Sequence, residues 1–174
     1  MKKVAGISTS SSKKSINKEL LKYTLTQIPK IETTILDLGE DIPIYNIDIE
    51  ETQGIPDYIT SLYQELQNYD GFILALPEHN GSMTALLKNT LDWLSRIDRN
   101  IFNNKNVFLL STSPGPSGGQ YAVRQVSQVI PFLGAKVAAS YSLPGFYNEF
   151  DNGISSIEEN EKLHTSIQEF VKQL

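Results

Sequence analysis

The sequence contains no cysteine among its 174 residues. Disulfide bonds, thiolate nucleophiles and metal sites with cysteine ligands are therefore excluded. Any oxidation or reduction that the chain carries out requires a bound cofactor, because the chain has no thiol pair of its own. The lack of cysteine does not by itself identify the cellular compartment.

Positive charge is also scarce, since 15 Lys and Arg residues stand against 20 Asp and Glu residues. A general nucleic-acid-binding protein needs clustered basic residues, so we expect no nucleic-acid partner. No apolar run approaches the roughly 20 residues of a membrane span. The run from Val4 to Ile7 is also shorter than the apolar core of a signal peptide, which has about 7–15 residues. These absences predict a soluble, cytoplasmic protein without a membrane partner.

Hydrophobic residues make up 40% of the chain, which is enough for a substantial core. The length favours one domain spanning residues 1–174. Short apolar runs predict strands at 4–7, 33–38, 72–76, 107–110 and 136–139. Helical patterns cover 16–28, 55–69, 82–97 and 120–133, with Pro131 tightening the last turn of the fourth, and a final helix follows Ser155 and Ser156. Residues 39–54 are predicted to form a polar loop.

This alternation predicts an α/β fold with a doubly wound parallel sheet and helices on both faces. Three polar loops follow the first, third and fourth strands. They read STSSSKKSIN (8–17), PEHNGS (77–82) and STSPGPSGG (111–119). Because the carboxyl ends of parallel strands meet at one edge of a sheet, these loops are candidates for a shared ligand site.

The first loop places hydroxyl groups and two lysines just before a helix, a combination that suits a phosphate group. It has neither the P-loop spacing nor a G-x-G-x-x-G fingerprint. A solvated loop with an N-cap serine is the alternative. The glycines of the third loop allow close approach to a flat ligand, or serve only a turn that needs positive φ.

The order of residues in these loops identifies a protein family more specifically than their composition does. GISTSSSKKSIN is similar to the pattern G-I-S-G-S-x-R-x-x-S-x-N. LPEHNGS and LLKNTLDWLSR are similar to T-P-E-Y-N-G-S and L-K-N-x-L-D-W-x-S-R, and SPGPSGG matches S-P-G-x-x-G-G. On these motifs, the sequence resembles the NAD(P)H-dependent FMN reductase family, and the resemblance covers almost the whole chain. The resemblance implies a flavodoxin-like five-stranded sheet of order 2-1-3-4-5.

The resemblance also implies an FMN site and assigns residues to it. Ser12 stands where the family often has Arg, so Lys13 or Lys14 would supply the missing positive charge. His79 replaces a family Tyr; alternatively, it points to solvent or into a subunit contact. The implied phosphate ligands are Ser10, Ser12, Lys13, Ser15 and Asn17, the ring contacts are Pro77, Glu78, His79 and Asn80, and the opposite side is lined by Thr112, Ser113, Gly115, Gly118 and Gly119.

The implied activity passes hydride from NADH or NADPH to flavin N5 and on to a small-molecule acceptor. Free flavin, a quinone, an azo compound or a metal oxyanion would serve as that acceptor. No catalytic side chain and no metal are expected, because the flavin carries the chemistry. Two alternatives are a flavodoxin-type electron carrier without NAD(P)H turnover and a flavin-free interaction module. Carriers tend to cover the ring with aromatic residues, and the second and third loops contain none.

The helix at 82–97 has more apolar positions than one stripe facing the sheet requires. In the family this helix helps to pair subunits, so the resemblance implies a homodimer or homotetramer. Trp93, the only tryptophan, and Leu94 are predicted to lie at this contact, with burial in the core as the alternative for Trp93. Asp92 and Arg96 are expected to form an exposed ion pair.

Overall fold

The computed structural model describes residues 1–39 and 41–174; Glu40, within the predicted loop at 39–54, lies outside the described residues. The strands are β1 (Lys3–Ser8), β2 (Glu32–Asp37), β3 (Gly71–Ala75), β4 (Asn106–Thr112) and β5 (Lys136–Leu143). The helices are α1 (Ile16–Thr26), α2 (Ile47–Gln53), α3 (Asp57–Leu66), α4 (Ala85–Ile97), α5 (Gln120–Val129), α6 (Phe146–Glu149) and α7 (Ile157–Lys172), and a 3₁₀ turn, η1 (Ile130–Leu133), follows α5.

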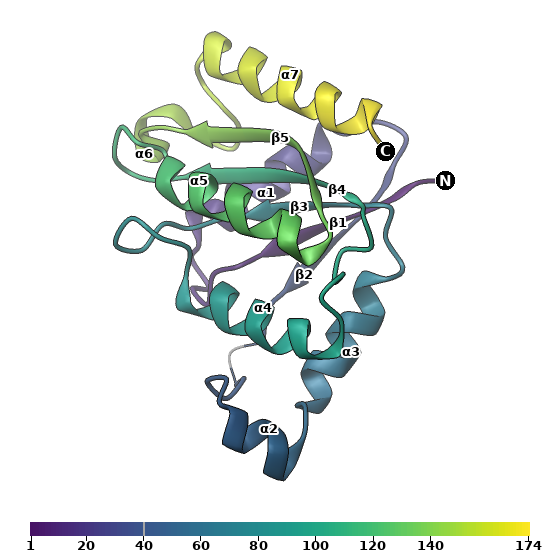
Figure 1. Cartoon of the computed structure of the whole chain (residues 1–174). Coiled ribbons are helices and arrows are strands. Elements are labelled where there is room, and N and C mark those ends of the chain that lie inside the picture. The colour runs from purple at the N-terminus through teal and green to yellow at the C-terminus, as the bar shows by residue number, and fades with distance from the viewer. Residues whose placement is uncertain (40) are drawn as a thin grey trace.

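The strands form one parallel sheet of order β2-β1-β3-β4-β5, which confirms the order that the family resemblance implied. Figure 1 shows their carboxyl ends at one end of the molecule, with both chain termini at the other. The loops after β3 and β4 and helix α6 lie together at the carboxyl end (Figure 1). The candidate loops therefore share the sheet edge at which they were predicted to meet.

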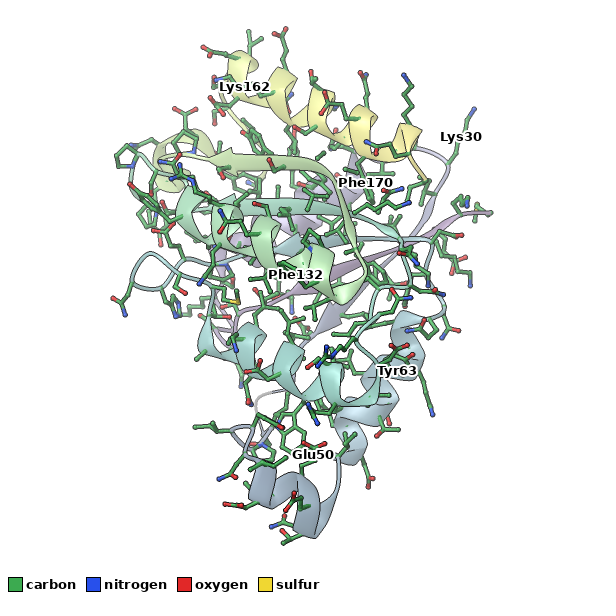
Figure 2. All side chains as sticks on the ribbon, viewed as in Figure 1. Lys30, Glu50, Tyr63, Phe132, Lys162 and Phe170 are labelled. Carbon is green, nitrogen blue, oxygen red and sulfur yellow. The ribbon has the colours of Figure 1, made fainter. Side chains whose placement is uncertain are left out.

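The core consists of two layers, one on each face of the sheet. In β3, Phe72 and Leu74 belong to the layer under α3, α4 and α5, whereas Ile73 and Ala75 belong to the layer under α1, α6 and α7. This alternation follows from the two-residue side-chain period of a strand, and burial on both faces explains the continuous apolar run. Figure 2 shows Phe170 of α7 on the sheet side of its helix, where its ring centroid lies 6.0 Å from that of Phe108.

Residues 39–54 are not only a loop, because helix α2 forms within them. The side chain of Asn46 accepts a hydrogen bond from the backbone of Asp48 and caps this helix. None of the α2 residues is buried, so no apolar periodicity marked it in the sequence. Figure 1 shows α2 outside α4 and away from the sheet. Helix α6, a single turn, was also not predicted.

The structure contradicts two predictions for the helix at 82–97, which is α4 with the residues just before it. Trp93 and Leu94 are 0% and 2% exposed within this chain, so the prediction that they form an external contact face is wrong. The Trp93 indole donates to the carbonyl of Pro43 at 2.7 Å and fastens the α2 segment to α4. The expected Asp92–Arg96 pair is also wrong, because Asp92 pairs with Lys88.

Arg96 instead pairs with Glu50 of α2, at 3.0 Å. Figure 2 labels Glu50 on the side of α2 that faces α4. The pKa of Glu50 lies below its usual range, chiefly because the Tyr45 hydroxyl and Arg96 donate hydrogen bonds to it. Among the described residues, no helix is long and apolar enough to cross a membrane.

Candidate functional site

A cleft of about 250 Å³ opens at the carboxyl edge of the sheet. All three candidate loops line it. Its predicted residues are Ser10, Ser12, Ser15, Asn17, Pro77, Glu78, His79, Thr112 and Ser113. Lys14, which was one of the two lysines considered for the missing charge, also lines it, and three residues that had not been assigned to the site, Ile16, Pro114 and Tyr147, complete the lining. The structure thus brings the first, second and third loops into one concave surface.

The other predicted site residues do not line this cleft. They are Lys13, Asn80, Gly115, Gly118 and Gly119. Of the two lysines that were alternatives for the missing charge, Lys14 lines the cleft and Lys13 does not. Gly118 and Gly119 both have positive φ, and a side chain on Gly118 would come within 2.9 Å of the Leu143 backbone. Close packing therefore requires both glycines, Gly118 against the end of β5 and Gly119 against Ser111 of β4, and neither lines the cleft.

Hydroxyl groups define the first-loop side of the cleft. Ser15 caps α1, because its Oγ accepts a hydrogen bond from the Lys18 backbone N–H. The Oγ of Ser10 accepts from the Ser12 backbone at 3.2 Å, so the loop is folded into tight local turns. Each hydroxyl that accepts in this way keeps its own proton for donation to a ligand. Lys14 stands exposed beside them and forms no ion pair with a described residue.

Asn17 connects the first loop to the third. Its Nδ2 donates to the Thr112 carbonyl at 3.0 Å, and its Oδ1 accepts from the Thr112 backbone N–H at 2.9 Å. Strand β3 ends before it can pair with Thr112, so the Asn17 amide supplies the missing main-chain partner. Both residues are buried. The side chain that was assigned to the phosphate is therefore engaged within the protein.

The second loop is a tight turn with two supports from α5. His79 and Ser82 exchange backbone hydrogen bonds, and the intervening Asn80 and Gly81 have φ of 53° and 72°, as an Asn-Gly turn requires. The Gln125 side chain accepts from both the Ser82 hydroxyl and the next backbone N–H, at 2.8 Å each. The turn is consequently fixed relative to α5.

Glu78 provides the second of these supports. Helix α5 begins after Gly119, which has no side chain to cap it. The Glu78 carboxylate fills that role, accepting from the Tyr121 backbone at 2.9 Å and from that of Ala122 at 3.4 Å. A negative charge at a helix N-terminus is stabilised by the helix dipole. Glu78 therefore ties the second loop to the end of the third.

His79 is exposed and lies between two clefts. Besides the cleft described above, it lines a neighbouring one of about 480 Å³ with Lys88 and Gln125. The sequence left its direction open, and the structure places it at the solvent boundary of the site. His79 thus forms part of an accessible wall of the cleft.

Two threonines that sequence reasoning missed also brace the site. Thr84 caps α4 and its hydroxyl donates to the Thr9 carbonyl at 2.8 Å, which joins the α4 terminus to the first loop. The Thr9 hydroxyl in turn donates to the Ala75 carbonyl at 2.7 Å. An N-cap pattern before the helix could have identified Thr84. No sequence signal distinguished Tyr147, which follows the last motif.

The groups around the cleft fit an anion carried on a flat organic ligand. The first loop offers serine hydroxyls and Lys14, and the only carboxylate in the lining, that of Glu78, is directed to the α5 backbone. Within the described residues, no set of carboxylate and imidazole groups could hold a metal ion. Hydrogen-bond donors and a positive charge at one end favour phosphate over a cation.

Comparison with known proteins agrees with this geometry. The sequence profile of one family, described as NADPH-dependent FMN reductase, matches residues 2–148. The quinone reductase of Escherichia coli K12 is 31% identical over 115 residues, which are 63% of this chain and 61% of that protein. An NAD(P)H-dependent FMN reductase of Pseudomonas aeruginosa is 32% identical over 131 residues, which cover 75% of this chain and 70% of that protein. The matched stretch is thus less than two thirds of the length of the Escherichia coli protein.

Solved structures share the same fold. FerB, a flavoenzyme NAD(P)H:(acceptor) oxidoreductase from Paracoccus denitrificans, superposes with a TM-score of 0.81 over 99% of this chain and 97% of its own. The two sequences are 24% identical. The order of strands and the layers of helices therefore correspond over nearly the full length of both chains.

Proposed function

Because this chain belongs to the NADPH-dependent FMN reductase family, we propose that it is an FMN-dependent oxidoreductase using NADH or NADPH. Its acceptor is a small molecule, with a quinone or free flavin favoured by the names of its relatives. The observation that carries this proposal is the convergence of all three motif loops on one cleft. An azo compound or a metal oxyanion remains an alternative acceptor.

FMN, when bound, would supply the hydride chemistry, and the chain would supply position and charge. Ser10, Ser12 and Ser15 face the cleft with hydroxyl protons available for a phosphate, and Lys14 adds a positive charge. The second and third loops would hold the two sides of the ring. Glu78 holds these loops at a fixed separation, since its carboxylate joins the second loop to the start of α5.

We further propose that the protein acts in the cytoplasm, where NADH and NADPH are available, as a homodimer or homotetramer. The family resemblance supports this assembly. Trp93 and Leu94 are not available for this contact, because both are buried within one chain. The polar outer surface of α4 and the α2 segment fastened to it remain accessible for pairing.

Purified protein should be titrated with FMN and then supplied with NADH or NADPH and a quinone. We expect the protein to bind FMN. We also expect it to oxidise NADH or NADPH only when both the flavin and the quinone are present. FMN binding without nicotinamide oxidation would favour an electron carrier, and failure to bind any flavin would favour an interaction module. Gel filtration of the same sample measures the assembly.

Lys13 and Lys14 offer a matched pair of variants, because they are adjacent, exposed and equally charged, but only Lys14 lines the cleft. A solvent-exposed ion pair contributes roughly 0.2–1 kcal/mol, so Lys14→Ala should raise the FMN Kd by about 1.5-fold to fivefold. Lys13→Ala should change it less. Equal changes in the two variants would contradict the placement of the phosphate beside Lys14.

A further inference from the structure

Tyr147 is an exposed aromatic residue at the edge of the cleft. It is 72% exposed although it lies on α6, whose neighbouring residue Phe146 is buried. Six of the eight tyrosine hydroxyls bond to a described residue, and those of Tyr121 and Tyr147 do not. Of these two, only Tyr147 lines the cleft. It therefore presents an unused hydrogen-bond donor to the site.

The backbone that carries Tyr147 is firmly held. Gly145 N–H donates to the Gly115 carbonyl and Phe146 N–H donates to the Ser113 carbonyl, both at 3.0 Å. On the other side, the Phe146 ring stacks on Phe150 with centroids 4.8 Å apart. The Phe150 ring meets Tyr23 of α1 edge to face at 5.7 Å. Helix α6 is thus fixed between the third loop and α1.

The layers of the fold place Tyr147 at one particular end of the cleft. The second and third loops lead into α4 and α5, which cover one face of the sheet. The first loop leads into α1 on the opposite face, and Phe146 packs into the core layer under α1. Figure 1 shows α6 at the carboxyl end of β5, on the far side of the sheet from α4. Tyr147 consequently shares the α1 side with the hydroxyls and lysine of the first loop.

We propose that Tyr147 donates its hydroxyl proton to the phosphate of the bound flavin nucleotide. This inference rests on the proposed function, since it names a ligand for the phosphate end of the same cleft. This donor would compensate for Ser12, whose side chain has no guanidinium group to bind the phosphate. A tyrosine hydroxyl at the same end of the cleft supplies a directional donor, and Lys14 supplies the charge.

The test is a set of binding titrations with FMN and with riboflavin, which lacks the phosphate. Tyr147→Phe removes only the hydroxyl, and we expect the FMN Kd to rise about twofold to tenfold, as for loss of one ordinary hydrogen bond. The riboflavin Kd should stay the same. Tyr63→Phe is the matched control, because it removes a hydroxyl bonded to Asp98, and Figure 2 shows Tyr63 on α3, far from this edge of the sheet.

Equal weakening of FMN and riboflavin by Tyr147→Phe would overturn the proposal, because it would place the hydroxyl on the ring or sugar. Unchanged binding of both would overturn it as well. If the parent protein bound neither flavin, the proposed function would fail, and inorganic phosphate would become the probe. A thermal shift with phosphate that Tyr147→Phe reduces and Tyr63→Phe retains would then support Tyr147 as a phosphate ligand. The same shift in all three proteins would reject it.

Discussion

Replacement of Asn17 by alanine should destabilise the protein more than a typical loop substitution. The change removes two hydrogen bonds, at 3.0 and 2.9 Å, and leaves the N–H and C=O of Thr112 without these partners. Thr112 is only 1% exposed, so water cannot readily replace the amide. An unsatisfied buried polar group costs about 1–3 kcal/mol. We expect a loss of roughly 2–4 kcal/mol in the free energy of unfolding.

Asn17→Asp is the control, because it keeps the size of the side chain and one acceptor oxygen. Its second oxygen would face the Thr112 carbonyl, so the donor is lost and two acceptors oppose each other. Urea denaturation of the parent and both variants measures the free energy. FMN binding should weaken together with stability in Asn17→Ala, since the change loosens the first loop, which is proposed to hold the phosphate.

A loss below about 0.5 kcal/mol in Asn17→Ala would refute the bracing role of the amide. A selective loss of FMN binding with unchanged stability would instead indicate that Asn17 binds the phosphate. The two roles are separated because stability is measured without ligand, where a phosphate contact contributes nothing.

Glu78→Gln should lower stability by roughly 0.3–1 kcal/mol, because the amide oxygen still caps Tyr121 N–H but the charge at the α5 terminus is lost. Urea denaturation at low and high salt would show this difference shrinking with salt, and a salt-independent difference would contradict the dipole contribution. The pKa of Asp70 is depressed, chiefly because the Lys3 backbone N–H donates a hydrogen bond to its carboxylate. The ionised carboxylate therefore stabilises the fold at pH values above its ordinary pKa, and this stabilisation is lost as the pH falls through the depressed pKa. Asp70→Asn should lower the free energy of unfolding by roughly 0.5 kcal/mol at pH 7, a small value because this side chain is 38% exposed. Near pH 2 the variant and the parent should be equally stable. An equal difference in stability at both pH values would argue against a role for the charge.

The sheet and its helices were predictable because their signals are periodic. Each buried strand shows a continuous apolar run, and the 3₁₀ turn at Ile130–Leu133 forms where Pro131 was expected to tighten the fourth helix. The segment at 42–53, which includes α2, was missed because it is held by polar bonds to Trp93 and Arg96 and by a few partly buried side chains without a regular period. The same segment covers Trp93 within one chain, with the Tyr45 ring 5.1 Å from the indole.

The site was predictable in its loops but not in the direction of its side chains. The motifs identified the stretches that line the cleft, and the parallel topology brought them to one edge. Neighbouring residues such as Lys13 and Lys14 carry the same chemistry, so only the local backbone decides which one faces the cleft. Gly118 was assigned to the ligand because a glycine indicates a position without room for a side chain. The sequence does not say which group takes up that room, and in the structure it is the backbone of Leu143.

The three loops are joined to one another by hydrogen bonds within the chain. Asn17 links the first to the third, Glu78 links the second to the third, and Thr84 links the α4 terminus to the first. A ligand entering such a cleft need not order the loops, so the conformational entropy lost on binding is small. Rigid placement can therefore offset a weaker individual contact. This preorganisation is a physical reason to expect that a phosphate can bind in the cleft without a guanidinium at position 12.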